Sequence, residues 1–188
     1  TTLNAGTLVA GSATFAFGGA GGTAGILTIN GGSLDASVAA AITNTVSLGA
    51  TLDFVGTANL TQNSGAITLT GSRAINVAAN TLTLNGLISG AGFGVTKSGA
   101  GKLILGGANT FGGGLTLSAG TLVLANNAAL GTGTFTVNGG VVDASPAATI
   151  TNAITLGADL TFTGTANLTQ GTGAIDLGAD RVITVNGS

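Results

Sequence analysis

Residues 52–62, LDFVGTANLTQ, return almost unchanged as LTFTGTANLTQ at residues 160–170. Apolar and polar residues alternate at the start of each copy: Leu160 and Phe162 fall on one face of an extended chain and Thr161 on the other. A period of two residues is typical of a β-strand, whereas a helix would repeat its apolar positions every three to four residues. The stretch therefore predicts short strands.

The repetition extends far beyond this stretch. A shift of 108 positions places residues 25–77 on residues 133–185, and 32 of these 53 positions are identical. Further upstream, LNAGTLV at 3–9 matches LSAGTLV at 117–123 at a shift of 114. The copies therefore differ by a six-residue insertion, which we place in a loop around the glycine run at 18–22.

The spacing of the strands predicts how they are arranged. Apolar pairs recur every six to eight residues, with Gly or Asn between them, which favours the corners of a solenoid over a series of hairpins. At about 22 residues per coil, the chain would form about eight coils stacked at the usual strand spacing. We predict an all-β, parallel β-helix (β-solenoid), uncapped at both ends because the sequence begins and ends within a repeat.

We treat residues 1–188 as a single solenoid segment. It contains an internal duplication, 3–77 and 117–185, and a linking repeat at 81–116.

The composition excludes several kinds of chemistry. The chain has six acidic and four basic residues, a net charge of −2, and no His, Cys, Met, Trp or Tyr. Disulfides, thiol or imidazole metal sites and histidine-based catalytic triads are thereby excluded, and there is no basic patch for nucleic acid. We expect no cofactor, no metal and no membrane insertion by this segment, whose apolar stretches, such as Val38 to Ile42, are short.

Four acids differ between the copies. Asp53, Asp159, Asp176 and Asp180 stand where the other copy has Thr or Ser, which indicates a solvated surface. An alternative is a weak cation or sugar contact formed by Asp176, Asp180 and Arg181 with Asp159 from a neighbouring coil. A glycosidase would need two carboxylates facing each other across a cleft.

Two acids and two arginines recur in both copies. Asp35 and Arg73 correspond to Asp143 and Arg181, and each pair is separated by 38 residues, or nearly two coils. We expect these residues to form an ion pair between coils or a hydrogen bond at a corner.

The remaining polar candidates also have a structural interpretation. Lys97 and Lys102 flank a Gly-Ala-Gly turn and are predicted to lie on the surface, because the P-loop pattern would require a following Ser or Thr. Asn59 and Asn167 are predicted to stack at corners, with ligand-binding amides as the alternative.

Threonines and phenylalanines recur along the chain. The Thr-x-Thr strands, such as residues 81–83 and 134–136, suggest an ice-binding surface, but they do not recur at a fixed coil period in the sequence. The seven Phe residues are predicted to lie in the core.

Residues 94–124, GVTKSGAGKLILGGANTFGGGLTLSAGTLVL, resemble the autotransporter-associated β-strand repeat. The similarity covers Thr96-Lys97, the Gly-Ala-Asn-Thr segment that ends at Phe111, and Ala119 to Leu122; Phe111 replaces the usual Tyr. The resemblance implies a right-handed parallel β-helix in the passenger of a type V secreted protein of Gram-negative bacteria. It also implies an extracellular location, anchored at the outer membrane.

Taken together, these features predict a structural, non-catalytic stalk or adhesive segment of a large bacterial surface protein. The alternatives are a self-assembling extracellular matrix fibre subunit, a carbohydrate-active β-helix enzyme and an ice-binding solenoid. The expected partners are neighbouring repeats of the same longer chain, further copies joined head to tail, and host or matrix ligands. With so few titratable groups, stability should depend only weakly on pH between about 5 and 9.

Overall fold

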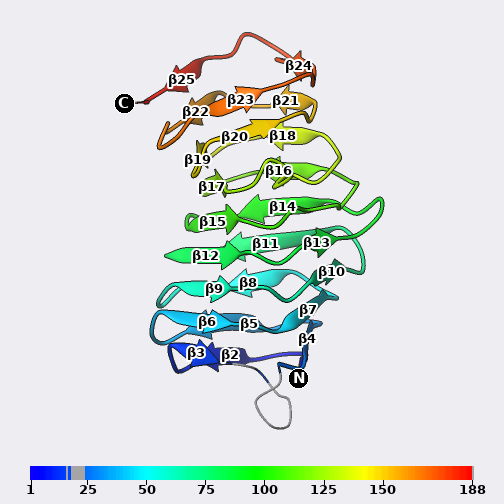
Figure 1. The fold of residues 1–188 in the computed structure, drawn as a ribbon, viewed down its shortest axis with the longest axis vertical. Helices are drawn as coiled ribbons and strands as arrows, with labels where there is room; N and C mark the ends of the chain where they lie inside the picture. The colour runs from blue at the N-terminus through cyan, green and yellow to red at the C-terminus, as the bar shows by residue number, and fades with distance from the viewer. Residues whose placement is uncertain (16, 18–23, 188) are drawn as a thin grey trace.

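A computed structural model describes residues 1–15, 17 and 24–187, and these residues form twenty-five short strands and no helix. Every strand pairs in parallel with a strand of a neighbouring coil, and the strands inside each sheet pair with one above and one below, so the chain climbs as a rod of stacked coils (Figure 1). The prediction of an all-β parallel solenoid of about eight turns is confirmed. The glycine run predicted to form the loop insertion lies largely outside the described residues.

The rod has three faces. Face A begins with β1 (Thr2–Leu3), β4 (Ile26–Ile29), β7 (Thr45–Leu48), β10 (Ile67–Leu69) and β13 (Ile88–Ser89), and ends with β20 (Ala148–Ile150) and β23 (Leu168–Gln170). Face B consists of β2 (Thr7–Ala10), β5 (Ser33–Ala36), β8 (Leu52–Phe54), β11 (Arg73–Val77), β14 (Val95–Ser98), β16 (Leu115–Leu117), β18 (Phe135–Val137), β21 (Ile154–Leu156) and β24 (Ile175–Asp176). Face C consists of β3 (Thr14–Phe15), β6 (Ala40–Ile42), β9 (Leu60–Gln62), β12 (Thr81–Leu84), β15 (Lys102–Leu105), β17 (Thr121–Leu124), β19 (Val141–Ala144), β22 (Leu160–Phe162) and β25 (Ile183–Val185).

Face A is interrupted in the middle of the rod. Between β13 and β20 the chain crosses this face twice without forming a strand, at residues 106–114 and 125–134. Hydrogen bonds still connect the levels, because Thr110 N donates to Ile88 O and Thr132 N donates to Phe111 O. Faces B and C continue through the same region as unbroken nine-stranded sheets.

The alternation seen in the sequence determines which side chains enter the core. On face C, Leu82, Leu103 and Leu122 are partners in register on successive coils, and each is at most 1% exposed. Thr83 follows Leu82 and points outward. Burying one aliphatic column per strand position is the main apolar contribution to the stability of the rod.

Glycine is required where successive corners approach each other closely. Gly56 has φ +80°, and a Cβ atom at this position would clash with the main-chain carbonyl of Ala79 on the next coil. A side chain here would therefore separate the coils as well as strain the backbone.

The two copies of the duplication occupy different faces of the rod. Strand β4 lies on face A, whereas its counterpart β18 lies on face B; likewise β8 lies on face B and its counterpart β22 on face C. Along face B, β18 lies five coils above β5, the strand that follows β4. The second copy is therefore displaced by five coils and rotated by one face, or a third of a turn.

The phenylalanines follow the prediction in part. Phe54, Phe111 and Phe135 are buried in the core, whereas Phe93 is 36% exposed at the corner before β14. The prediction that all seven lie in the core is wrong for Phe93, because the glycines around it place it in a turn and not on an inward strand position.

Exchange of a core leucine for alanine should show which face of a strand carries the stability. We expect Leu82→Ala to lower the free energy of unfolding by about 2–5 kcal/mol, because it removes buried methyl groups and leaves a cavity. Thr83→Ala, on the outward side of the same strand, should cost less than about 1 kcal/mol. Urea unfolding followed by circular dichroism measures both, and equal losses would contradict the assignment of inward and outward positions.

Candidate functional site

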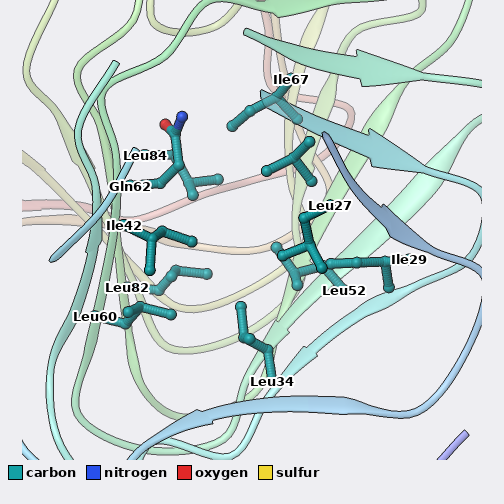
Figure 2. A pocket seen from close by; sticks show the side chains of 11 residues that line it. Leu27, Ile29, Leu34, Ile42, Leu52, Leu60, Gln62, Ile67, Leu82 and Leu84 are labelled. Atoms are coloured by element: carbon teal, nitrogen blue, oxygen red, sulfur yellow. The ribbon is translucent and has the colours of Figure 1, made fainter. Parts of the chain in front are cut away.

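The interior of the lower coils contains a small cavity lined by aliphatic side chains and one amide. Figure 2 shows Gln62 pointing inward among residues that include Leu27, Leu60 and Leu84. The free space is about 10 Å³, room for about one water molecule. Gln62 Nε2 donates to Asn44 O (3.1 Å) and to Gly65 O, and its Oε1 accepts from Gly86 N. This cavity is therefore a packing gap beside a satisfied amide.

The four acids that differ between the copies do not converge on one site. Asp53 accepts a hydrogen bond from Asn76 Nδ2 on the next coil (3.0 Å), and Asp159 accepts one from Val182 N (3.1 Å). Asp176 bonds only the nearby Gly178 N, and Asp180 is exposed. Within the described residues no group of three acidic, His or Cys side chains could hold a metal ion.

The recurring acids form hydrogen bonds between successive coils. Asp35 accepts hydrogen bonds from Thr57 N (2.9 Å) and Thr57 Oγ1 (2.6 Å), one coil above. Asp143 forms the same pair of bonds with Thr165. Burial alone would raise the pKa of each carboxyl, but these hydrogen bonds favour the ionised form and lower the pKa below its usual value. Their contribution to stability is therefore present at neutral pH and is lost as the pH falls through the lowered pKa.

The recurring arginines do not pair with these acids. Arg73 Nε donates to Leu48 O (3.2 Å), and Arg181 Nε donates to the equivalent carbonyl of Leu156 (3.1 Å). Of the two predicted arrangements, the corner hydrogen bond is therefore correct and the ion pair is wrong. Asn59 also acts at a corner, where its Oδ1 accepts from Thr81 N on the next coil.

The prediction for Lys97 is wrong. Its side chain is fully buried, in register with Ile75 below and Leu117 above on face B, whereas Lys102 lies on the surface as predicted. Lys97 Nζ donates to three main-chain carbonyls: Ser98 O (2.7 Å), Gly99 O (2.8 Å) and Ala119 O (3.1 Å). Burial disfavours the ammonium form and lowers the pKa of Lys97 from 10.5 to about 8. The alternation of Val95, Thr96 and Lys97 in the sequence places the lysine on the inward side of the strand. The prediction of a surface position followed the charge of the side chain instead.

Threonines on face B stack more regularly than the sequence indicated. Thr96, Thr116, Thr136 and Thr155 are partners in register on successive coils. Only Thr136 of this column belongs to a Thr-x-Thr strand, so the column does not contradict the expectation that these strands do not recur at a fixed coil period. The four residues are 20, 20 and 19 positions apart, a nearly constant spacing of one coil.

A groove lies on face A where its strands are interrupted. The groove has a volume of about 510 Å³. Its lining carries only amide, hydroxyl and small side chains, from Asn109, Asn127, Ala128, Gly131, Thr132, Thr149, Thr151 and Asn152. A tight turn forms its floor, in which Ala129 N donates to Asn126 O and Gly131 N donates to Ala128 O (both 3.1 Å). The sequence analysis missed this site, because no charged or aromatic residue marks it.

Comparison with protein families locates the middle of the rod in a known repeat. Residues 95–124 and 119–144 match the family model described as the Passenger-associated-transport-repeat. The resemblance to autotransporter passengers is confirmed for residues 95–144. The passenger-associated transport repeat thus contains Lys97, Asp143 and the floor of the groove. Neither a search of curated proteins nor one of solved structures found a match to the chain.

The buried ammonium of Lys97 should make stability depend on alkaline pH. Between about pH 8 and 10.5 the unfolded chain binds more protons at this residue than the folded chain, so the free energy of unfolding should rise with pH. The full rise would be at most about 3–4 kcal/mol, for a shift from 10.5 to about 8 at about 1.4 kcal/mol per pKa unit. The shallow pH dependence expected from the sequence would then hold only below about pH 8.

Urea unfolding at a series of pH values tests this effect. Lys97→Met, which keeps much of the side-chain volume, should abolish the rise, whereas Lys102→Met should preserve it. A rise of the same size in Lys97→Met would show that another group is responsible.

Proposed function

We propose that this chain is a structural, non-catalytic segment of a surface-exposed bacterial passenger, serving as a rigid spacer with adhesive faces. The observation that carries the proposal is the pair of nine-stranded sheets that run the length of the rod on faces B and C. Each inner strand in these ladders is hydrogen-bonded to two neighbours, which resists bending. The passenger-associated transport repeat supports secretion and display at the outer membrane. No helix in the described residues is long and apolar enough to cross a membrane.

The positions of the polar residues favour this function over an enzyme. Asp35 and Asp143 are engaged with threonines of the next coil, and Lys97 is enclosed by carbonyl groups. General acid–base catalysis needs a titratable group within reach of a substrate proton. The exposed acids are Asp159, Asp176 and Asp180, and in the described part of the chain the only hydrogen bonds to their carboxyl groups come from the main chain, at Val182 N and Gly178 N.

Two experiments distinguish an enzyme from a rigid spacer. We expect the chain to leave pectin, xylan and β-glucan uncleaved at the level of the buffer blank. Spin labels on Thr68→Cys and Thr149→Cys, in a chain without native cysteine, should give one narrow distance distribution by pulsed electron paramagnetic resonance. Turnover that Asp159→Asn or Asp176→Asn abolishes would establish the enzyme, and a broad distance distribution would contradict the rigid spacer.

The C-terminal coils carry a surface suited to a further coil. A hollow of about 210 Å³ is lined by apolar side chains, including Phe162 and Val185, and by Gln170. Gln170 Oε1 is buried without a hydrogen-bond partner, whereas Oε1 of its counterpart Gln62 accepts from Gly86 N on the coil above. Val185 is 65% exposed. We propose that a further coil packs on this surface, from a neighbouring repeat of the same longer chain or, for residues 1–188 alone, from a second copy, since another coil would supply both apolar cover and a donor.

Sedimentation velocity over a range of concentrations tests this contact. We expect concentration-dependent oligomers, which Val185→Lys should weaken by placing a charge in the apolar hollow. Val55→Lys, at an exposed corner on the side of the rod, is the matched control and should leave association unchanged. A concentration-independent monomer, or equal loss in both variants, would overturn the proposed contact.

A further inference from the structure

The duplication allows an amide of the groove on face A to be compared with its counterpart in the first copy. Asn44 in the first copy corresponds to Asn152 in the second, and both are buried at the start of a coil corner. Asn44 Nδ2 donates to Phe17 O (3.0 Å) and Gly25 O (2.6 Å), and its Oδ1 accepts from Phe17 N (2.9 Å). All the hydrogen-bonding groups of this amide are therefore used within the protein.

Asn152 keeps only part of this arrangement. Its Nδ2 donates to Gly131 O (3.1 Å) and Gly133 O (2.7 Å), the positions equivalent to Phe17 and Gly25. Two carbonyl acceptors fix the orientation of the amide, because only its nitrogen can donate to both. Gly131 N, the group equivalent to the donor at Phe17, instead donates to Ala128 O within the turn. Among the described residues, no donor reaches Asn152 Oδ1.

This unpaired oxygen belongs to a residue that is 8% exposed and lines the groove. The only fully buried side-chain polar atom without a partner in the described part of the chain is Gln170 Oε1, so Asn152 Oδ1 is open to the groove. Around it, Thr149 and Thr151 are exposed, and their hydroxyl groups have no hydrogen-bond partner among the described residues. Asn127 Oδ1 accepts from Thr149 N (2.8 Å), which leaves the Nδ2 of Asn127 free to donate.

We propose that this groove is a binding site for a neutral oligosaccharide, occupied by one or two sugar units. The proposal rests on the proposed function as an adhesive spacer and names the ligand class for it. A sugar supplies hydroxyl donors for Asn152 Oδ1, and its oxygens can accept from Asn127 Nδ2 and the threonine hydroxyls. Ala128 and Gly131 are small residues at the floor, which leaves room for a sugar ring.

Other ligand classes match the groove less well. An anionic ligand would lack a basic partner, because no charged residue lines the groove. A peptide added as a strand would need free main-chain groups, yet Ala148 N already donates to Asn167 O and Thr149 N to Asn127 Oδ1. A cation would meet no carboxylate oxygen there.

The binding should be weak at a single groove. Few polar groups and no aromatic ring contact the ligand, so we expect a Kd of about 1 mM. Adhesion would then depend on many such sites acting together along a surface.

Nuclear magnetic resonance of the ¹⁵N-labelled chain tests the proposal. Cellotetraose, maltotetraose, laminaritetraose and tetra-N-acetylchitotetraose are the probes, each titrated to about 10 mM, roughly ten times a millimolar Kd. At least one should shift the amide signals of residues 127–132 and 149–152 in a saturable way. Absence of shifts with all four probes, saturable shifts confined to other faces, or stronger binding of polygalacturonate would overturn the proposal.

Matched variants distinguish a loss of binding at the groove from a general loss of folding. Thr151→Val should weaken binding at least five-fold, whereas Thr43→Val, the same repeat position in the first copy, should leave it unchanged. Ala128→Leu removes no hydrogen bond and should block the floor. Equal effects of Thr151→Val and Thr43→Val would also overturn the proposal. Failure of binding would leave the distance distribution and the absence of turnover unaffected, so the two proposals fail independently.

Discussion

Parallel main-chain hydrogen bonds between successive coils determine the spacing of everything else in this rod. They hold each strand about 4.8 Å above the last, so every side chain lies directly over its register partner. Leu82, Leu103 and Leu122 form a continuous column for this reason. The same spacing excludes a Cβ atom at corners such as Gly56.

The main-chain hydrogen bonds between coils are interrupted at the corners, where polar side chains supply the missing partners. Where a strand ends, its main-chain groups lose their partners, and leaving them buried and unpaired would be costly. Gln62, Asp35 and Lys97 each bond such groups, on their own coil or on a neighbouring one. Residues of the types used in catalysis are thus occupied in holding coils together. The ligand-binding potential of the rod consequently lies where a corner amide, Asn152, keeps an unused acceptor.

The sequence was sufficient to predict the strands, the parallel solenoid and the duplication, because alternation such as Leu160-Thr161-Phe162 reports directly on burial. It was insufficient for Lys97. The charge of this residue suggested a position on the surface, although the alternation of its strand placed it on the inward side, where main-chain carbonyls accept its hydrogen bonds. The groove was also missed, because it depends on whether Gly131 N bonds within its own turn or to Asn152. Such a choice between two nearby acceptors leaves no mark in periodicity or composition. The threonine column of face B was missed because only one of its members, Thr136, belongs to a Thr-x-Thr strand.

The rotation of the second copy by one face affects how such rods meet one another and their surroundings. Equivalent surfaces, such as the Asp35–Thr57 and Asp143–Thr165 corners, point in directions a third of a turn apart. Two rods lying side by side therefore cannot keep identical patches in contact along their whole length. This limits the side-by-side association of many rods. A receptor approaching from different sides would nevertheless meet closely related chemistry. For the proposed adhesive role, the displacement would make binding depend little on the orientation of the rod.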